Sequence, residues 1–461
     1  MKKKSVLIGL CICLAFTAFQ TEVNNLHNQV KIVKAEEVPV DKVGNMSVAK
    51  VRKILQKVKD IDETDNGKMW GMRLDTRIMV VDPDTRKIIT TEADNDGTFK
   101  KMGNLYKGQL PDDVGIANST IQYGGKQWAM IIYFESNDTL DLLNTYIHEM
   151  FHNIQKDLGL DGATSSEGTN SIYYDNSHMD EMNARIYLKL EWEALHKALN
   201  SSGAAKKKAI ADALTFRYAR RKEYNSSKDE NAFEIQEGIT EYTAERLVYS
   251  TDDLMDQILR SDWKRYLNEK ETPTFVRSFA YHSGVLYGLL LDECSSDWRQ
   301  SITYQSDLGE LLRQQYAINL SALSSKESEK RYNFKGIYQY EKKRKKKMKE
   351  TILKYTKKFI DGPVLQINLT NADVSFNPNN IRVLKGQGSI YEIAEIYDNF
   401  GQIVVTEGGV LISTDWNKAI VSSKNIQISD KTIKGKGWTL KMKSGYSLKK
   451  QKNGCYILQN K

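Results

Sequence analysis

The stretch from Thr145 to Ile154 constrains this chain most, because it places two histidines four positions apart. His148 and His152 enclose the sequence His-Glu-Met-Phe-His. Positions four apart lie one above the other on a helix, so the two imidazoles can face one metal ion. Glu149 is displaced by one step, where its carboxylate can take a proton from water at the metal. We therefore predict a metal site on this helix, with Glu149 as the general base.

The residues around the motif favour a helix with one buried face. Ser136, Asn137 and Asp138 are candidate N-caps, and Gly159 is expected to end the helix. Apolar residues recur at steps of three and four, which is typical of an amphipathic helix: Leu140, Leu143, Ile147, Phe151, Ile154 and Leu158. The alternative interpretation is a pair of partly buried histidines that bind no metal.

Residues 1–35 predict a secretory signal peptide and a short N-terminal segment. Lys2, Lys3 and Lys4 precede an apolar core from Val6 to Phe19, which is too short to span a bilayer comfortably. Cleavage after Ala18 and cleavage after Ala35 both remain open. Removal of residues 1–35 lowers the net charge from +8 to about +4, an excess too small to imply nucleic acid. We expect a secreted protein with no membrane span after processing.

The overall composition is that of an ordinary soluble globular protein. Among 461 residues, 40% are hydrophobic and 27% are charged, and this length predicts two domains. Two cysteines remain after processing, Cys294 and Cys455. Export permits a disulfide, but their separation along the chain leaves the pairing open.

Sequence periodicity predicts a mixed N-terminal half. We expect a helix over Val48–Val58, and a hairpin whose strands flank Asp82-Pro83-Asp84-Thr85. A Gly- and Asp-rich loop is expected over Gly103–Gly125, and a strand over Gln127–Phe134. This strand is either an edge strand that pairs with an extended peptide or a plain core strand.

The second half divides into helices and then strands. Helices are expected over 179–199, 204–221, 233–249, 253–265, 278–292 and 340–358, with polar loops over 159–177 and 225–231. The run Lys342–Lys347 either contacts an anionic cell-surface polymer or, as we favour, belongs to a solvated helix that joins two domains. After Gly362-Pro363, short alternating runs predict an all-β domain built as a small sandwich.

A second motif supplies a third metal ligand by resemblance. His-Glu-x-x-His followed by Glu-Gly-x-x-x-Tyr, here Glu237 to Tyr242, resembles the gluzincin metallopeptidases, the superfamily of thermolysin and the zinc aminopeptidases. The resemblance implies that Glu237 is the third zinc ligand and that Glu241 supports a zinc-bound histidine. Four acidic residues nearer in sequence remain alternative ligands: Asp180, Glu181, Glu191 and Glu193. His178 and His282 are expected to be packed or loop residues.

A third motif, Tyr281-His282-Ser283-Gly284, is similar to the Tyr-x-x-Gly of zinc aminopeptidases. The likeness implies that the Tyr281 hydroxyl stabilises an oxyanion; the alternative is a core aromatic on an apolar helix. The Gly-x-Met-Glu-Asn strand of that branch is absent from the sequence, so the choice between exopeptidase and endopeptidase stays open.

The resemblance implies a zincin-like domain over 36–360, and the alternating runs that follow predict a β domain over 363–461, so we expect an α+β chain. The zincin-like domain would combine a small N-terminal mixed sheet with a mostly helical C-terminal subdomain. The implied function is a secreted peptidase that uses Zn2+ to cleave a peptide or protein substrate, as in uncharacterised secreted bacterial members of the superfamily. The alternatives are a non-catalytic cell-envelope protein with a structural zinc, and a toxin-like effector protease.

Overall fold

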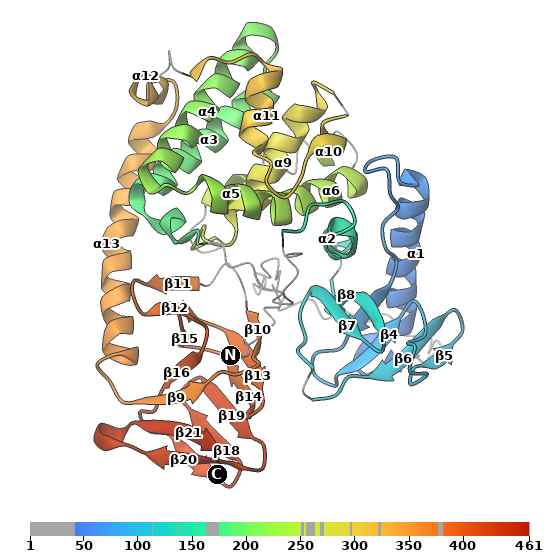
Figure 1. Cartoon of the computed structure of the whole chain (residues 1–461), viewed down its shortest axis with the longest axis vertical. Coiled ribbons are helices and arrows are strands. Elements are labelled where there is room, and N and C mark those ends of the chain that lie inside the picture. Colours follow the sequence, from blue (N-terminus) through green and yellow to red (C-terminus); the bar gives the residue numbers. More distant parts are fainter. Residues whose placement is uncertain are drawn as a thin grey trace, which may run out of the picture.

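The computed structural model describes residues 42–112, 114–136, 138–162, 175–249, 253–254, 263–267, 272–295, 297–320, 324–376 and 381–460. Three regions follow one another along the chain: an N-terminal mixed sheet, a central helical region and C-terminal β sheets (Figure 1). The α+β class expected from the sequence is therefore confirmed. The predicted signal peptide, most of the predicted loop over 159–177 and most of the predicted helix over 253–265 lie outside the described residues.

The first helix, α1 (Val48–Asp65), follows a short ladder of β1 (Lys42–Val43) and β2 (Met46–Ser47). It begins where the side chain of Ser47 accepts a hydrogen bond from the backbone of Lys50, and it ends at Asn66 in the left-handed conformation. The predicted helix over Val48–Val58 is confirmed, and Val48, Val51, Leu55 and Val58 are buried, whereas Ile54 is half-buried. The predicted hairpin is also confirmed, as antiparallel strands β3 (Ile78–Val81) and β4 (Lys87–Thr90).

The N-terminal sheet has the order β5-β6-β4-β3-β8-β7, with β5 (Lys100–Met102), β6 (Leu105–Gln109), β7 (Ser119–Tyr123) and β8 (Lys126–Ile132). The loop predicted over Gly103–Gly125 is wrong, because this range contains β6 and β7. Gly103, Gly124 and Gly125 have positive φ and make tight turns between antiparallel strands, as glycine readily does.

The position of β8 decides between the two interpretations of the strand after Gly125. It lies between β3 and β7, so β8 is a core strand and the edge-strand prediction is wrong. The edge is β7, which the sequence did not predict as a strand. Helix α2 (Thr139–Gln155) follows β8 and contacts both β7 and β8.

The central region is a helical bundle that shares one hydrophobic core with α1 and α2. The predicted polar loop over 225–231 is wrong, because the turn needs only Asn225, in the left-handed conformation, and Ser226 before the chain is helical again. The elements are η1 (Ser177–Asp180), α3 (Met182–Leu199), α4 (Gly203–Tyr224), α5 (Ser227–Phe233), η2 (Glu234–Gly238), α6 (Ile239–Val248), α8 (Trp263–Leu267), α9 (Phe279–Asp292), α10 (Trp298–Ser301), α11 (Leu308–Gln315) and α12 (Ser325–Glu329).

Helix α13 (Phe334–Phe359) connects the helical region to the C-terminal sheets. The predicted basic helix is confirmed, but its run is not wholly solvated, because Arg344 is buried in an ion pair with Glu341. Cys294 and Cys455 are both free thiols. Within the described ranges, no helix is both long enough and apolar enough to cross a bilayer.

Two β sheets form the C-terminal region. One has the order β10-β13-β14-β19-β18-β17 and the other β11-β12-β15-β16-β9-β21-β20, and residues of both sheets share one core. This arrangement is the sandwich that the sequence predicts. The strands are β9 (Val364–Asn368), β10 (Asp373–Phe376), β11 (Ile381–Leu384), β12 (Gly388–Tyr391), β13 (Ala394–Asp398), β14 (Gly401–Val405), β15 (Val410–Ser413), β16 (Lys418–Ser422), β17 (Gln427–Ser429), β18 (Thr432–Gly435), β19 (Trp438–Met442), β20 (Tyr446–Lys450) and β21 (Tyr456–Asn460).

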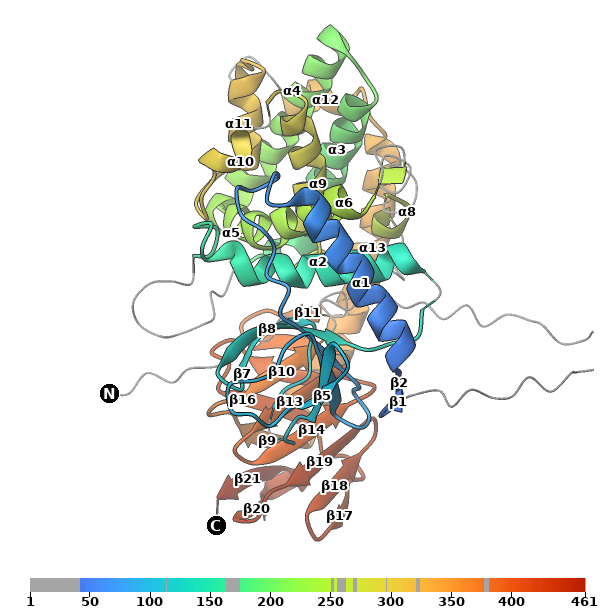
Figure 2. The same cartoon turned by 90° about the vertical axis from the view of Figure 1, so that its right-hand side faces the viewer.

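The N-terminal sheet and the sandwich lie side by side beneath the helical region in Figure 1, and the N-terminal sheet lies in front of the sandwich in the turned view of Figure 2. The Ser375 hydroxyl donates to the carbonyl of Ile116 at 2.8 Å, and an Arg86 Nη1–H donates to the Tyr397 hydroxyl at 3.0 Å. The sandwich is therefore docked on the turn between β3 and β4 and on the loop that leads into β7, the strand beside α2.

Candidate metal centre

Helix α2 carries His148, Glu149 and His152 into the interior between the N-terminal sheet and the helical region. It begins at Asp138, whose side chain accepts hydrogen bonds from the first turn, and it ends at Gln155 rather than at the predicted Gly159. His148 and Glu149 are almost fully buried, whereas the His152 side chain is 14% exposed. His152 is therefore the residue of the motif that contacts solvent, whereas His148 and Glu149 lie deeper in the protein.

Glu237 meets the two histidines from the far side. It lies on η2, a single π-helical turn, and such turns are frequent at functional sites. Its Oε2 lies 3.6 Å from Nε2 of His148 and 3.6 Å from Nε2 of His152, and the two Nε2 atoms are 3.2 Å apart. These three atoms form a nearly equilateral triangle that could hold a metal ion. The structure thus brings together the three residues that the sequence predicts as ligands.

Neighbouring oxygens fix the orientation of both rings. Nδ1 of His148 lies 2.7 Å from Glu241 Oε2, and Nδ1 of His152 lies 2.7 Å from Gln155 Oε1. A carboxylate and an amide oxygen accept here, so each Nδ1 carries a proton and each ring turns its Nε2 toward Glu237. Glu241 lies where the resemblance implies a supporting residue.

Gln155 supports His152 as Glu241 supports His148, and our sequence analysis did not predict this role. Its Nε2 donates to the carbonyl of Gln236 at 2.7 Å and to the Thr240 hydroxyl at 2.9 Å, while its Oε1 holds His152. One amide thereby ties α2 to η2 and α6. The available signal was position, because a residue three after His152 lies on the same helix face.

Tyr281 on α9 completes the cluster. Its hydroxyl donates to Glu237 Oε2 at 2.7 Å, and its ring stacks on His148 with centroids 5.7 Å apart and planes inclined by 14°. The ring is also buried in the hydrophobic core on an apolar helix, as the alternative interpretation expects. Tyr281 reaches the cluster because α9 packs closely on η2 and α6.

The cluster is strongly acidic. Glu149, Glu237 and Glu241 are buried together, and within the described part of the chain no lysine or arginine pairs with any of them. Burial raises the pKa of Glu149 to about 7, although both histidines oppose the rise. Burial alone would lower the pKa of His148, but hydrogen bonds to Glu237 and Glu241 raise it to about 10. Such a site favours a bound cation.

The alternative acidic ligands are engaged elsewhere. Asp180 accepts from Arg185 at 3.0 Å, Glu191 accepts from the Tyr287 hydroxyl at 2.7 Å, and Glu193 accepts from the backbone of Asn333 at 3.0 Å. Glu181 is exposed at the start of α3. None of the four belongs to the ligand group found among the described residues.

His178 and His282 are packed, as predicted. His178 lies 2.8 Å from Glu230, and His282 lies 2.9 Å from His196. Neither joins His148 and His152 in the ligand group found in the described ranges.

Buried ion pairs between α4 and η2 hold η2 in place. Arg217 Nη1 donates to Glu234 Oε1 at 2.8 Å, and Arg221 Nη2 donates to the other oxygen of Glu234 at 3.3 Å. Glu234 is three residues before Glu237, so α4 anchors the turn that presents Glu237 to the histidines. Removing one partner of such a buried pair is strongly destabilising, because a charge is left uncompensated.

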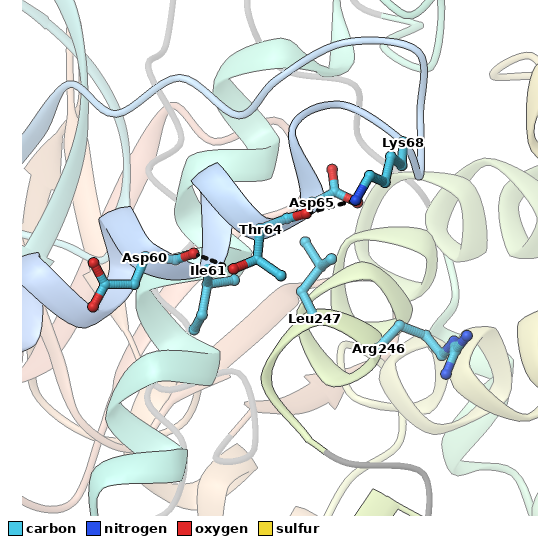
Figure 3. A pocket seen from close by; sticks show the side chains of 7 residues that line it. All are labelled: Asp60, Ile61, Thr64, Asp65, Lys68, Arg246 and Leu247. Carbon is cyan, nitrogen blue, oxygen red and sulfur yellow. Dashed lines mark hydrogen bonds between the residues drawn. The ribbon is translucent and has the colours of Figure 1, made fainter.

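A pocket of about 420 Å³ lies between α1 and α6, away from the metal cluster (Figure 3). The Thr64 hydroxyl donates to the carbonyl of Asp60, and Lys68 donates to the carbonyl of Thr64. These polar groups satisfy their own helix instead of converging on the pocket, so the pocket has no feature of a catalytic site.

Comparisons of the chain with models of protein families, with curated proteins and with solved structures give no match.

Proposed function

We propose that this chain is a zinc-dependent peptidase of the gluzincin kind. The observation that carries the proposal is the convergence of His148, His152 and Glu237 beside a buried Glu149 whose two oxygens have no hydrogen-bond partner in the protein. A free carboxylate next to a three-residue ligand group is the arrangement that metal-assisted hydrolysis of a peptide bond requires. The resemblance of the three sequence motifs to gluzincins supports the same reaction.

The donor set fits zinc. Two imidazole nitrogens and one carboxylate oxygen form a common catalytic zinc site, which keeps a fourth position for water or substrate. Bond lengths of about 2.0–2.2 Å at a tetrahedral ion place neighbouring ligand atoms about 3.3–3.6 Å apart. The observed separations are 3.2, 3.6 and 3.6 Å. Glu237 Oε1 is buried and has no hydrogen-bond partner in the protein, which suits an oxygen beside a cation.

Each residue then has a defined task. Zinc, when bound, polarises a carbonyl and lowers the pKa of water. Glu149 accepts the proton of the attacking water and passes it to the leaving amine. The Tyr281 hydroxyl, whose one hydrogen is donated to Glu237 Oε2 in this structure, turns to donate a hydrogen bond to the oxyanion that develops on the scissile carbonyl. Glu241 and Gln155 hold the two imidazoles in the tautomer that leaves Nε2 available.

Strand β7 offers a way to bind an extended substrate. It is the edge of its sheet, and the Thr120 hydroxyl donates to Asn153 at 2.9 Å, one residue after His152. Backbone groups on an edge strand can pair with a peptide independently of its side chains. We propose that the substrate adds to β7, which takes over the role that the sequence had suggested for β8.

Localisation remains a proposal from the N-terminal sequence. Residues 1–35 have the pattern of a signal peptide, so we propose that the mature protein is secreted. N-terminal sequencing of the protein recovered from culture medium tests this, because cleavage after Ala18 or Ala35 predicts a defined new terminus. A protein retained in the cell with Met1 intact would contradict the proposal.

The decisive experiment compares the wild type with Glu149→Gln. We expect one zinc per chain in both proteins by mass spectrometry, and hydrolysis of a quenched peptide library by the wild type alone. Loss of the general base lowers kcat by about 10²–10⁴-fold. Glu193→Gln is the matched control, because Glu193 is a carboxylate outside the cluster. This variant should retain full activity.

The outcomes separate the alternatives. Equal hydrolysis by the wild type and by Glu149→Gln removes the mechanism. Bound zinc without hydrolysis of any peptide favours a non-catalytic envelope protein. Hydrolysis confined to one sequence in an unbiased cleavage screen favours a dedicated effector protease over a broad scavenger.

A further inference from the structure

Helix α13 has two chemically opposite faces. Its buried side chains are separated by four, three, eleven and four positions, so they lie on one side of the helix. This side packs on the helical region and the sandwich through Ile337, Glu341, Arg344, Tyr355 and Phe359. The exposed face carries nine lysines and one acidic residue, Glu350. We call these nine the lysine face: Lys335, Lys342, Lys343, Lys345, Lys346, Lys347, Lys349, Lys354 and Lys357.

The helix that presents the lysine face is clamped at both ends. Near its start, Glu341 accepts from Lys189 at 2.6 Å and from Arg185 at 3.2 Å. Near its end, the Tyr355 hydroxyl donates to Glu392 at 2.7 Å, and Lys358 donates to the carbonyl of Gly408 at 2.6 Å. Helix α13 thus runs along the outer side of the helical region and of the sandwich (Figure 1). The lysine face is therefore a rigid strip about 33 Å long.

Most of the charge of the lysine face is not neutralised by the part of the protein that the structure describes. Apart from Lys347, none of its lysines forms an ion pair with a carboxylate in the described part of the chain. Lysines three and four positions apart repel one another on a helix, so this face destabilises the helix that carries it. Residues 334–461 hold 24 Lys and Arg against 10 Asp and Glu, whereas residues 1–333 hold 43 against 49. The excess positive charge is therefore confined to the C-terminal part.

We propose that the lysine face binds a linear polymer of phosphate groups laid along the axis of α13. Six lysines between Lys342 and Lys349 lie within about 11 Å, and a partner must carry a charge every few ångströms to match them. A phosphate in each backbone repeat supplies that density. Lysines are flexible point charges, and they suit a polymer of repeating phosphates better than a single planar anion.

Two features of α13 argue against a membrane surface and against single-stranded nucleic acid as the partner. Helices that lie on membranes insert a continuous apolar face. The apolar face of α13 is packed inside the protein, and exposed Leu353 and Ile360 lie about two helical turns from each other. Single-stranded nucleic acid binds through bases stacked on aromatic rings. The exposed aromatic side chains of α13, Tyr338 and Tyr340, both precede Lys342, and the described residues between Lys342 and Lys357 include no exposed aromatic side chain. The proposal is independent of the metal centre.

The test uses the full chain and long-chain inorganic polyphosphate as the probe, with binding followed by calorimetry at several NaCl concentrations. We expect the wild type to bind, with an affinity that falls steeply as salt rises. Lys342→Gln, Lys343→Gln, Lys346→Gln and Lys349→Gln combined should weaken binding by about tenfold or more and reduce the slope of log affinity against log salt by about 3. The unchanged helix content of this variant is checked by circular dichroism.

The matched control removes the same charge elsewhere. Lys53→Gln, Lys107→Gln, Lys207→Gln and Lys208→Gln combined replace exposed lysines on α1, β6 and α4, and should leave the affinity within about twofold of the wild type. Equal weakening in both variants shows attraction to net charge alone and overturns the proposal. Binding to phosphatidylglycerol vesicles that polyphosphate does not displace identifies a membrane surface and overturns it too, as does failure to bind polyphosphate at low salt.

Discussion

Gly238 and Gly284 touch backbone to backbone where η2 crosses α9. A Cβ on Gly284 would lie 2.3 Å from Cα of Gly238, and a Cβ on Gly238 would lie 2.6 Å from the carbonyl oxygen of Ala280. Carbon atoms do not approach so closely, so only glycine fits at both positions. The crossing places Tyr281, three residues before Gly284, beside Glu237, the residue before Gly238. The two glycines in the sequence motifs therefore set the distance between the hydroxyl and the carboxylate.

Gly284→Ala should push α9 away from η2. Overpacking of this kind destabilises a core by about 1–3 kcal/mol, and the displacement should also lower kcat because Tyr281 moves with α9. Urea unfolding and peptide hydrolysis measure the two effects. An unchanged midpoint and an unchanged kcat would show that the crossing does not position Tyr281.

Tyr281→Phe should lower kcat by about 10²–10³-fold while leaving the zinc content unchanged, because it removes one donor to the developing oxyanion. Tyr242→Phe is the matched control on the neighbouring helix. The Tyr242 hydroxyl donates to Asp292 at 2.7 Å and accepts from Arg299 at 2.9 Å, so its loss should reduce stability with little effect on kcat. Similar kcat values for Tyr281→Phe and the wild type would refute the role of Tyr281.

Gln155→Met should weaken metal binding by about 10–100-fold, because the amide orients the His152 ring and ties α2 to η2. Competition with a chromophoric chelator measures the dissociation constant. Gln56→Met is the control, since Gln56 is exposed on α1 and, among the residues that the structure describes, bonds only to Asp60. An affinity equal to that of the control would mean that the ring is held by other contacts.

Asp373→Asn should stabilise the protein above about pH 6. Asp373 packs against Gly115 at the junction of the sandwich and the N-terminal sheet, and burial raises its pKa to about 6 from an ordinary 3.8. The folded state thus binds the proton more tightly than the unfolded state, so the stability that Asp373 contributes is full below about pH 3.8 and is lost as the pH rises through about 6. Asparagine keeps an acceptor for the backbone of Gly115 and never ionises.

The expected gain for Asp373→Asn at pH 7.5 is on the order of 2 kcal/mol, and it should shrink toward pH 4.5. Urea unfolding of the zinc-loaded protein at the two pH values measures the difference. Glu395 faces the same carboxyl and opposes its ionisation, so Glu395→Gln should show a smaller gain of the same sign. A gain independent of pH would show that ionisation of Asp373 is not its cause.

Local features of the fold were predictable because they depend on neighbours in sequence. The period of apolar residues predicted α1, α2 and α9, and the turn residues after Val81 predicted the β3–β4 hairpin. Glycine was ambiguous: at Gly103 and Gly124 it makes tight turns between strands, and the sequence pattern alone resembled a long loop. Strand order is a property of pairing between distant segments, so the sequence did not show that β7 covers the edge of β8.

The sequence by itself determined the chemistry available to the site: two imidazoles and a general base at helical spacing, and a Glu-Gly pair and a Tyr-x-x-Gly further along the chain. Only the tertiary structure decided which carboxylates meet the imidazoles. Glu237 and Glu241 approach because the Gly238–Gly284 crossing and the Arg217–Glu234 pair hold η2 against α2, whereas Asp180, Glu191 and Glu193 have the same side-chain chemistry but find partners elsewhere. The physical reason is that helix spacing fixes contacts over one or two turns, while contacts across some ninety residues depend on how whole helices pack.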